Sequence, residues 1–205
     1  MDEDEGYPIP ERPILLPVPD RFEGERVVVR AFGDDDVAEV YAAIRESIEH
    51  LQPWLPFAHL SLEDEREFIR RAQARFLLRE GFDMGIFARD GGAFLGGVGL
   101  HVLKWGIPSC EIGYWIRLSA QGRGYVSEAV RLMTGFAFDG LSAQRVVIRC
   151  DARNARSAAV AERLGYALEG RLRRDSLDTS GHPRDTLIYA MILDDYDQAR
   201  GSWTG

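Results

Sequence analysis

The sequence predicts a mixed α/β domain with an antiparallel front half and at least one β-α-β crossover. Residues 25–32 place β-branched residues in an alternating frame, which favours a strand. Asp90-Gly91-Gly92 separates two apolar runs, a strong signal for a hairpin of antiparallel strands. Apolar residues then recur at helical spacing in two later segments, each of which lies between predicted strands. The predicted order is β-α-α-β-β-β-α-β-α-β-β.

The composition is that of a single globular domain. The chain has 205 residues, of which 45% are hydrophobic and 28% charged, so it is long enough to bury a substantial core. Its 25 Lys and Arg against 33 Asp and Glu leave a net charge of −8. This balance argues against direct nucleic-acid binding through phosphate neutralisation, and it weakly favours cationic substrates such as amines.

Cys110 and Cys150 are the two cysteines, too few for a disulfide framework or a clustered metal site. We interpret them as small buried apolar residues, although a bridge between them stays open. No segment approaches the ~20 apolar residues of a membrane helix, and the acidic start, MDEDEG, differs from a secretory signal. The sequence therefore predicts a cytoplasmic protein with no metal and no membrane association.

Residues 1–24 are predicted to form a proline-rich arm outside a single domain of residues 25–205. The first 20 residues hold five of the nine prolines, and proline is excluded from helix interiors and from central strands. We therefore expect an extended arm, either disordered or laid over the surface of this or another subunit. The prolines concerned are Pro8, Pro10, Pro13, Pro17 and Pro19.

Two helices are expected after the first strand. The acidic run at 33–36 offers an aspartate N-cap for a helix with an apolar stripe. Ser61 opens SLED, a capping-box pattern, for a second helix that ends before Gly81. Between the two, LQPWLPF at 51–57 carries two prolines and interrupts the helical pattern. The stripe of the first helix is Val37, Val40, Tyr41, Ile44 and Ile48.

The second half of the chain alternates strands and helices. A strand at 110–118 joins the hairpin of 82–103, and a helix runs from about residue 124 to 138. A shorter helix spans 154–165, with Gly165 as its C-cap. The remaining strands are predicted over 143–151, 166–177 and 184–193.

The loop QGRGYVS, at 121–127, lies between a predicted strand and a predicted helix. Exposed N–H groups at a helix start favour an anion, and Gly122 and Gly124 allow close backbone approach and positive φ. Three interpretations compete: a turn without a ligand, a dinucleotide fingerprint, and the pyrophosphate loop of an acyl-coenzyme A-dependent transferase. Asp151 at the end of the next strand favours the dinucleotide. However, Ser127 stands where the third glycine is needed, and the preceding strand comes late in the chain.

The loop resembles the coenzyme A signature Q-x-x-G-x-[GA] of the GNAT acyltransferase superfamily. Val126 departs from it, because the last position is normally glycine or alanine. Further segments resemble the RimJ/RimL branch in order and spacing, from about residue 25 to 193. They are WLPFA, EIGYWI, GRGYVSEAVR, RVVIRCDARNARSAAVAERLGYALEG and RDTLIYAM, and the matching loop residues are Gln121, Gly122, Arg123, Gly124 and Tyr125.

This resemblance implies a GNAT-type fold and a coenzyme site. The fold is a mixed, mostly antiparallel sheet of about seven strands with helices on both faces and a β-α-β unit that binds acetyl-CoA. Besides the loop of 121–127, the resemblance implies that the backbone at Ile116, Arg117 and Leu118 pairs with the pantetheine arm and polarises the thioester. Arg123 and Arg156 are candidates for the coenzyme phosphates, although exposed arginines are often only solvated.

Acetyl transfer from a thioester to an amine needs a proton acceptor and a donor for the leaving thiolate. Glu111 is the candidate base, and strand alternation puts it on one face with Gly113 and Trp115. A solvated strand-end glutamate is the alternative, but in the resembling family a glutamate here faces the acceptor amine, often through water. Asn154 and Ser157 suit an N-cap, whereas the resemblance implies a pantetheine ligand and a proton donor near the sulfur.

The acceptor side is less determined by the sequence. Trp54, His101 and Tyr114, together with Trp115, are candidates to line a pocket opposite the coenzyme. Trp54 is equally suited to the core, and we interpret His101 more readily as a strand residue with a local partner than as a second base.

The sequence therefore predicts an enzyme, an acetyl-CoA-dependent N-acetyltransferase that transfers acetyl directly to a primary amine. The favoured acceptor is the N-terminal α-amine of a protein or peptide. Small amines such as polyamines or antibiotics are alternative acceptors in the same branch. A non-catalytic acyl-CoA sensor with the same fold is the alternative from another class. The resemblance also suggests a homodimer.

Overall fold

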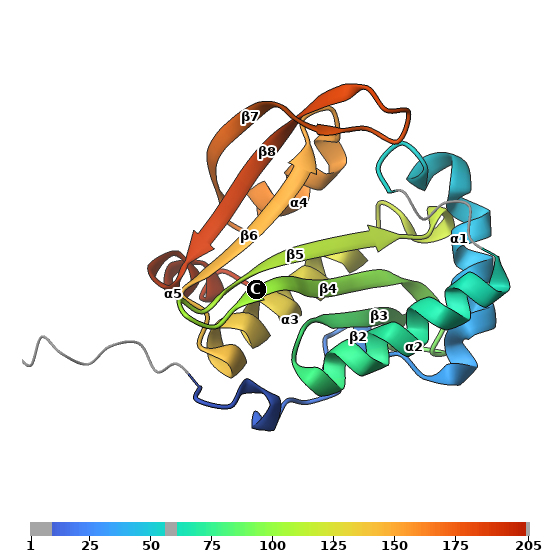
Figure 1. The fold of residues 1–205 in the computed structure, drawn as a ribbon, viewed down its shortest axis with the longest axis horizontal. Coiled ribbons are helices and arrows are strands. Elements are labelled where there is room, and N and C mark those ends of the chain that lie inside the picture. Colours follow the sequence, from blue (N-terminus) through green and yellow to red (C-terminus); the bar gives the residue numbers. More distant parts are fainter. Residues whose placement is uncertain (1–9, 56–60, 204–205) are drawn as a thin grey trace, which may run out of the picture.

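A single parallel pair interrupts an otherwise antiparallel sheet. The computed structural model describes residues 10–55 and 61–203, within which eight strands form one sheet in the order β1-β2-β3-β4-β5-β6-β8-β7 (Figure 1). Strands β5 and β6 run parallel and are connected through α3, so the predicted β-α-β crossover is confirmed. The strands are β1 (Arg21–Glu23), β2 (Val27–Ala31), β3 (Phe82–Ala88), β4 (Phe94–Lys104), β5 (Ser109–Ile116), β6 (Arg145–Asp151), β7 (Ala167–Leu177) and β8 (Pro183–Ile192).

Helices cover both faces of the sheet, as predicted. On one face α1 packs on β4 and α2 packs on β3, while on the other face α3 lies against β2, β4 and β5 (Figure 1). α4 joins α3 on its face and contacts β6 and β7. The helices are α1 (Val37–Leu51), α2 (Leu62–Leu78), α3 (Tyr125–Gly135), which continues as a π-helical turn over Phe136–Gly140, α4 (Ala155–Arg163) and α5 (Leu193–Arg200).

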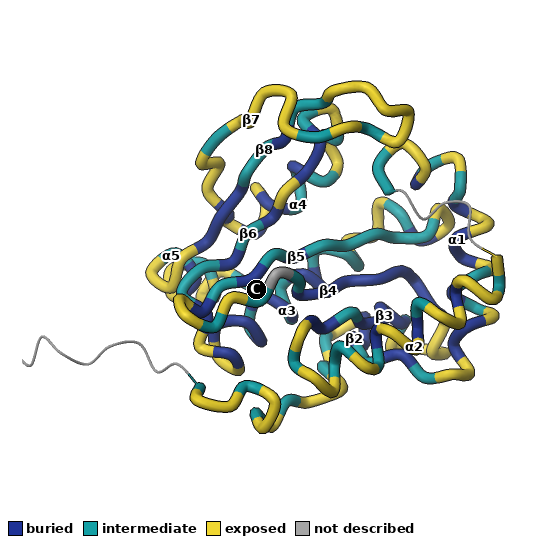
Figure 2. Tube along the Cα trace, in the orientation of Figure 1, coloured by how far each residue is buried: buried dark blue, intermediate teal, exposed yellow. Residues whose placement is uncertain are grey.

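Two apolar layers, one on each face, hold these helices. Ile86 belongs to the layer under α3 and its neighbour Phe87 to the layer under α1 and α2, because consecutive strand residues point to opposite faces. Strands β3 and β4 are buried along most of their length, whereas β7 and the outer sides of α1 and α2 are exposed (Figure 2). The sheet is therefore a two-sided scaffold in which β3 and most of β4 are buried, whereas β5 is only partly buried.

The helix caps agree with the sequence in one case and differ in the other. Ser61 caps α2 as predicted, since its Oγ accepts from the Asp64 N–H and the Asp64 carboxylate accepts from the Ser61 N–H. The aspartate cap expected for α1 is wrong. Asp36 instead accepts from the Gly33 N–H at 2.7 Å and binds Arg30, which stabilises a 3₁₀ turn over Asp34–Asp36 before the helix.

The predicted arm is partly built into the sheet. β1 pairs antiparallel with β2, so residues 21–23 belong to the sheet, which has eight strands rather than about seven. The segment before β1 packs on the surface of its own subunit, because the Arg79 guanidinium donates to the carbonyl of Leu16 at 2.9 and 3.1 Å. A strand at the edge tolerates the nearby prolines, since one side of it needs no ladder partner. Residues 1–9, with Pro8, lie outside the described residues.

The C-terminal helix α5 was not predicted, and it completes the layer under α3. Tyr196 is buried there, stacks on Phe138 with ring centroids 4.7 Å apart, and donates to Asp139 at 2.7 Å. Cys110 and Cys150 are buried and free, as the interpretation of them as small apolar residues requires. The bridge between them that the sequence left open does not form.

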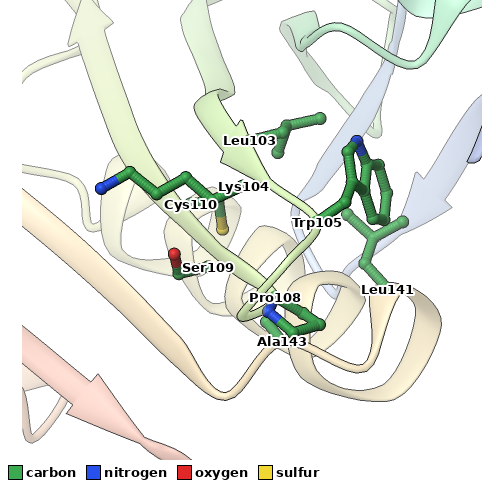
Figure 3. Close-up of a pocket in the computed structure, with 8 residues that line it drawn as sticks. All are labelled: Leu103, Lys104, Trp105, Pro108, Ser109, Cys110, Leu141 and Ala143. Atoms are coloured by element: carbon green, nitrogen blue, oxygen red, sulfur yellow. The ribbon is translucent and has the colours of Figure 1, made fainter. Parts of the chain in front are cut away.

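Strands β5 and β6 pair over only three residues and then diverge. The parallel register runs from Ser109↔Arg145 to Glu111↔Val147. Beyond it β5 stays with β4 and β6 stays with β8, so a wedge opens between them (Figure 1). At the opposite, closed end of β5 lies a small pocket lined by Leu103, Lys104, Trp105, Pro108, Ser109, Cys110, Leu141 and Ala143 (Figure 3).

A buried glutamate ties the start of α3 to the start of β2. The Glu128 carboxylate accepts from the backbone N–H groups of Arg26 and Val27, at 2.8 and 3.3 Å, and from Arg26 Nε at 3.0 Å. A Cβ on Gly24 would lie 2.3 Å from Glu128 Oε1, so glycine is needed for this approach. Burial acts to raise the pKa of Glu128, but the hydrogen bonds from Arg26 and Val27 outweigh it and lower that pKa below its usual 4.5.

We expect Glu128→Ala to lower the free energy of unfolding by about 3 kcal/mol, because buried donors lose their acceptor. Urea unfolding at neutral pH measures this, with Glu49→Ala, at an exposed position on α1, as the control that changes stability little. Since the folded pKa of Glu128 is lowered, its contribution is present above about pH 4.5 and is lost as the pH falls through the folded value. Equal stabilities of variant and wild type at neutral pH would show that the hydrogen bonds of Glu128 do not stabilise the contact between α3 and β2.

Candidate active site

The diverging edge of β5 presents free backbone groups to the wedge. The Arg117 N–H donates to the Leu95 carbonyl of β4 at 2.8 Å. Alternate residues of an antiparallel strand direct their backbone groups to opposite sides. Tyr114 and Ile116 therefore turn theirs away from β4, toward the wedge that β6 has left. This open edge can pair with an extended ligand as an added strand would.

Leu118 and the Arg117 backbone, in contrast, are occupied within the chain. The Leu118 N–H donates to Ser47 Oγ at 2.9 Å, and the Arg117 guanidinium binds Glu46 of α1. The hydrogen bond from Arg117 lowers the pKa of Glu46 to about 2, although burial acts in the opposite direction. Of the three residues expected to meet the pantetheine arm, only Ile116 has its backbone directed into the wedge.

The glycine loop adopts the conformation that an anion site needs. Gly122 and Gly124 have φ values of +73° and +79°, and α3 begins at Tyr125. The first N–H groups of an α-helix have no partner in the preceding turns, so they point outward with the positive end of the helix dipole. The Arg26 guanidinium fixes the loop from the side, because its Nη1 donates to the Arg123 carbonyl at 2.9 Å.

Gln121 carries an orphaned donor in this loop. Its Oε1 accepts from Arg156 Nη1 of α4 at 2.7 Å, while its Nε2 is buried and has no hydrogen-bond partner among the described residues. A buried polar atom without a partner calls for one. The orphaned amide, the positive-φ glycines and the helix start together fit the pyrophosphate of coenzyme A.

The remaining loop residues also have structural contacts. Val126 packs against the core, and the Ser127 hydroxyl accepts from Arg163 Nη1 at 3.0 Å. The Arg26 guanidinium lies 5.6 Å from the centre of the Tyr125 ring. Only the backbone N–H groups of these three residues stay candidates for coenzyme contact.

The two residues predicted at the start of α4 lie across the wedge from β5. Asn154 is its N-cap, since its Oδ1 accepts from the Ser157 N–H at 3.1 Å, so the capping interpretation holds. The Tyr114 hydroxyl donates to the Ser157 carbonyl at 2.9 Å and lies 3.1 Å from Ser157 Oγ. Burial raises the pKa of Tyr114 above its usual value, which keeps this hydroxyl protonated. Two hydroxyls therefore meet in the open part of the wedge, near Cys150, which also contacts Ser157.

Glu111 lies at the vertex of the wedge, on the face that α1 and α2 cover. Its register partners are His101 on β4 and Val147 on β6. Burial raises the pKa of Glu111, and the nearby charges of Arg149 and His101 oppose that shift. Glu111 is the last residue of β5 that pairs with β6. A partly desolvated carboxylate at such a position is suited to accept a proton from a bound amine.

The acceptor candidates divide between the two faces. His101 shares the face of Glu111, and its ring covers Gly99 and Gly113. Trp115 lies on this face too, over Gly97 and 5.7 Å from the ring of Phe94. Tyr114 points to the opposite face, toward α4, so it does not join an acceptor pocket with His101 as predicted.

Trp54 is half-buried in the turn after α1, and no contact among the described residues links it to Glu111. Its neighbours Phe57 and Ala58 in the WLPFA segment lie outside the described residues. At the end of α1, burial and the charge of Arg156, in α4, lower the pKa of His50.

Sequence reasoning missed the residues that hold this site from a distance. No local sequence pattern predicts the contacts of Arg26, Glu128 and Glu46, because their hydrogen-bond partners lie 71 to 102 positions away in the sequence. Glu65 on α2, which has no contact with the site among the described residues, was also not singled out from the sequence. It is 1% exposed, burial raises its pKa to about 7, and neither carboxylate oxygen has a hydrogen-bond partner among the described residues.

Comparison with known proteins agrees with this geometry. Residues 26–167 match the family model described as an acetyltransferase (GNAT) domain. YdaF of Bacillus subtilis (strain 168), which carries the name of a ribosomal N-acetyltransferase, is 30% identical over 84% of this chain and 94% of its own. The ribosomal-protein-serine acetyltransferase of Escherichia coli (strain K12) is 27% identical over 83% of this chain and 94% of its own. RimL, a ribosomal L7/L12 alpha-N-protein acetyltransferase whose structure is known in complex with coenzyme A, is 26% identical in sequence. Its structure aligns with a TM-score of 0.77 over 84% of this chain and 97% of its own.

A sheet that splits beside a glycine-rich helix start is the framework of an acyl-coenzyme A-dependent transferase, and the chain belongs to the GNAT acetyltransferase family. It is an N-acetyltransferase that uses acetyl-CoA as its co-substrate. Through residues 10–55 and 61–203, no helix combines the length and the apolar character that crossing a bilayer requires.

We expect Gly124→Ala to weaken coenzyme A binding at least about tenfold, because a Cβ at φ +79° strains the loop and would lie 3.2 Å from Arg26 Nη2. Isothermal titration measures the Kd for coenzyme A. The matched control is Gly181→Ala, which has the same strain at φ +81° on the exposed β7–β8 turn, with no other atom within 4 Å. Both variants should lose about 1 kcal/mol of stability, and only the first should lose affinity. Unchanged affinity in Gly124→Ala would remove the loop from the coenzyme site.

Proposed function

We propose that this enzyme acetylates the N-terminal α-amino group of a protein, in the first place a ribosomal protein. The observation that carries the proposal is the arrangement at the wedge, where a free β5 edge at Ile116 lies beside the helix start at Gly124 and a partly buried carboxylate, Glu111, lies at the vertex. The names of the relatives, which include a ribosomal-protein-serine acetyltransferase, support the choice of acceptor.

The chain's own residues supply binding and proton transfer. When bound, acetyl-CoA contributes the activated thioester. The N–H groups of residues 122–127 and the Gln121 amide are proposed to hold its pyrophosphate, with Arg123 and Arg156 as added positive charge. The Ile116 N–H is a donor directed into the wedge, suited to polarise a carbonyl. Of the two hydroxyls at the wedge, Ser157 is the proposed proton donor to the leaving thiolate, and Tyr114 positions it.

Glu111 is proposed to hold the acceptor ammonium and to take up its proton, directly or through water. An α-amino group, with a pKa near 8, is partly neutral at pH 7, whereas a lysine side chain near 10.4 is almost fully protonated. A single partly buried carboxylate therefore suffices more readily for an α-amine than for lysine. The same chemistry suits small amines, so polyamine or antibiotic acetylation is the second candidate.

The cellular setting and the assembly are proposed in the same way. We propose a cytoplasmic enzyme, since ribosomal proteins are the acceptors named for its relatives. A homodimer and a single domain over residues 25–205 stay predictions from the sequence, and size-exclusion chromatography with light scattering tests the first of them.

We expect Glu111→Gln to lower kcat by about 100-fold or more with an unchanged Kd for coenzyme A, because the amide cannot accept the proton. Stopped-flow detection of thiol release gives kcat, and isothermal titration gives Kd. In the wild type the rate should fall on the acid side as Glu111 protonates, at a higher pH than an ordinary carboxyl group because burial raises its pKa. A variant with full kcat would remove Glu111 from the chemistry.

The acceptor class is tested with a panel of amines. The enzyme and acetyl-CoA are incubated with peptides that have a free N-terminus, the same peptides with a blocked N-terminus and an internal lysine, polyamines and aminoglycosides. We expect thiol release with the free N-termini and none with the blocked peptides. Release only with polyamines or aminoglycosides would establish the second candidate. Coenzyme binding without release for any amine would favour an acyl-CoA sensor.

A further inference from the structure

The imidazole of His101 lies on the acceptor face, over the strand that borders the wedge. A Cβ on Gly99 would lie 2.9 Å from His101 Cε1, and one on Gly113 would lie 3.2 Å from its Nε2. The ring therefore lies over Gly113, two residues beyond Glu111 along β5 and past the last residue that pairs with β6. Two neighbouring glycines leave the space that the ring fills.

Asp83 holds this ring from the side away from Gly113. Its Oδ1 lies 3.4 Å from His101 Nδ1, and its Oδ2 accepts from Arg75 Nε and Nη2 at 2.9 and 2.6 Å. The Asp83 side chain is only 12% exposed, whereas that of His101 is 41% exposed. A carboxylate beside Nδ1 favours the tautomer with the proton on Nδ1, which leaves Nε2 as a free proton acceptor.

Carboxylates flank the ring on both neighbouring strands. Asp83 on β3 and Glu111 on β5 flank the imidazole, Arg75 on α2 reaches it only through Asp83, and Arg149 on β6 acts on Glu111. Imidazoles exchange protons near neutral pH, closer to the pKa of an α-amine than a carboxyl group does. Efficient general bases have a pKa near the working pH.

We infer that His101, oriented by Asp83, is a second catalytic base that receives the proton of the acceptor amine. The Glu111 carboxylate holds the ammonium while Nε2 of His101 takes its first proton, and the neutral amine can then attack the thioester. The new C–N bond leaves a positively charged nitrogen, whose second proton passes to Glu111 as the thiolate leaves. Glu111 and Asp83 together stabilise the resulting imidazolium, which returns its proton to solvent through the exposed side of the ring. The inference deepens the proposed function and rests on it for the identity of the acceptor.

The test compares His101→Gln, His101→Ala and Asp83→Asn with wild type, using the amine that wild type acetylates fastest in the panel. We expect His101→Gln to lose about 100-fold in kcat and Asp83→Asn about tenfold, both with an unchanged Kd for coenzyme A. Added imidazole at constant pH and ionic strength should restore activity to His101→Ala and leave wild type unaffected. The matched control is His182→Gln, which removes an exposed histidine 3.8 Å from Asp178 on the β7–β8 turn and should retain full activity.

Wild-type kcat in His101→Gln would overturn the inference and leave Glu111 as the sole base. So would a loss in His101→Ala that imidazole does not relieve, combined with full activity in Asp83→Asn. If wild type acetylates no amine, the proposed function fails, and ¹⁵N NMR of the imidazole still tests the pair. A Nδ1-protonated tautomer that Asp83→Asn abolishes supports the base, whereas an equal mixture of tautomers in wild type refutes it.

Discussion

The contact between Glu128 and the start of β2 fixes the helix start that is proposed to bind coenzyme. One carboxylate joins the first turn of α3 to residues about a hundred positions earlier in the chain, and the same Arg26 that pairs with it also holds the carbonyl of Arg123. The N–H groups that are proposed to face an anion are thus positioned by an ion pair that does not itself belong to the loop. Glu128 is 3% exposed and the Arg26 side chain is 53% exposed, so the carboxylate of this ion pair is buried while its guanidinium faces solvent.

The split between β5 and β6 leaves both faces of one strand available to the proposed chemistry. Alternation along β5 sends Tyr114 toward Ser157 and α4, and Glu111 toward His101 and the layer of α1 and α2. In the proposed mechanism, proton donation to the thiolate and proton removal from the amine therefore take place on opposite faces of the same strand. The backbone at Ile116, directed sideways into the wedge, lies between them.

Local patterns predicted most elements, because they depend on neighbours in sequence: the hairpin at Asp90-Gly91-Gly92, the Ser61 capping box and the crossover helix all follow from spacing and turn chemistry. The edge strand β1 and helix α5 were missed, since β1 is only three residues long and α5 is mostly polar. The side-chain partners were not predictable. Asp83 lies beside His101 through sheet register, and Leu118 is bound by Ser47 across 71 positions, so only the folded chain brings them together.

The glycines of β4 have a consequence for how such an enzyme changes its preferences. Gly97 and Gly99 contribute no side chain, and their space is filled by Trp115 from the next strand and by His101 from the same one. The two glycines therefore determine where the Trp115 and His101 rings lie, and with them the shape of this face. A side chain at either glycine would displace one of these rings, and so change the face proposed to receive the acceptor without altering the residues proposed to contact it.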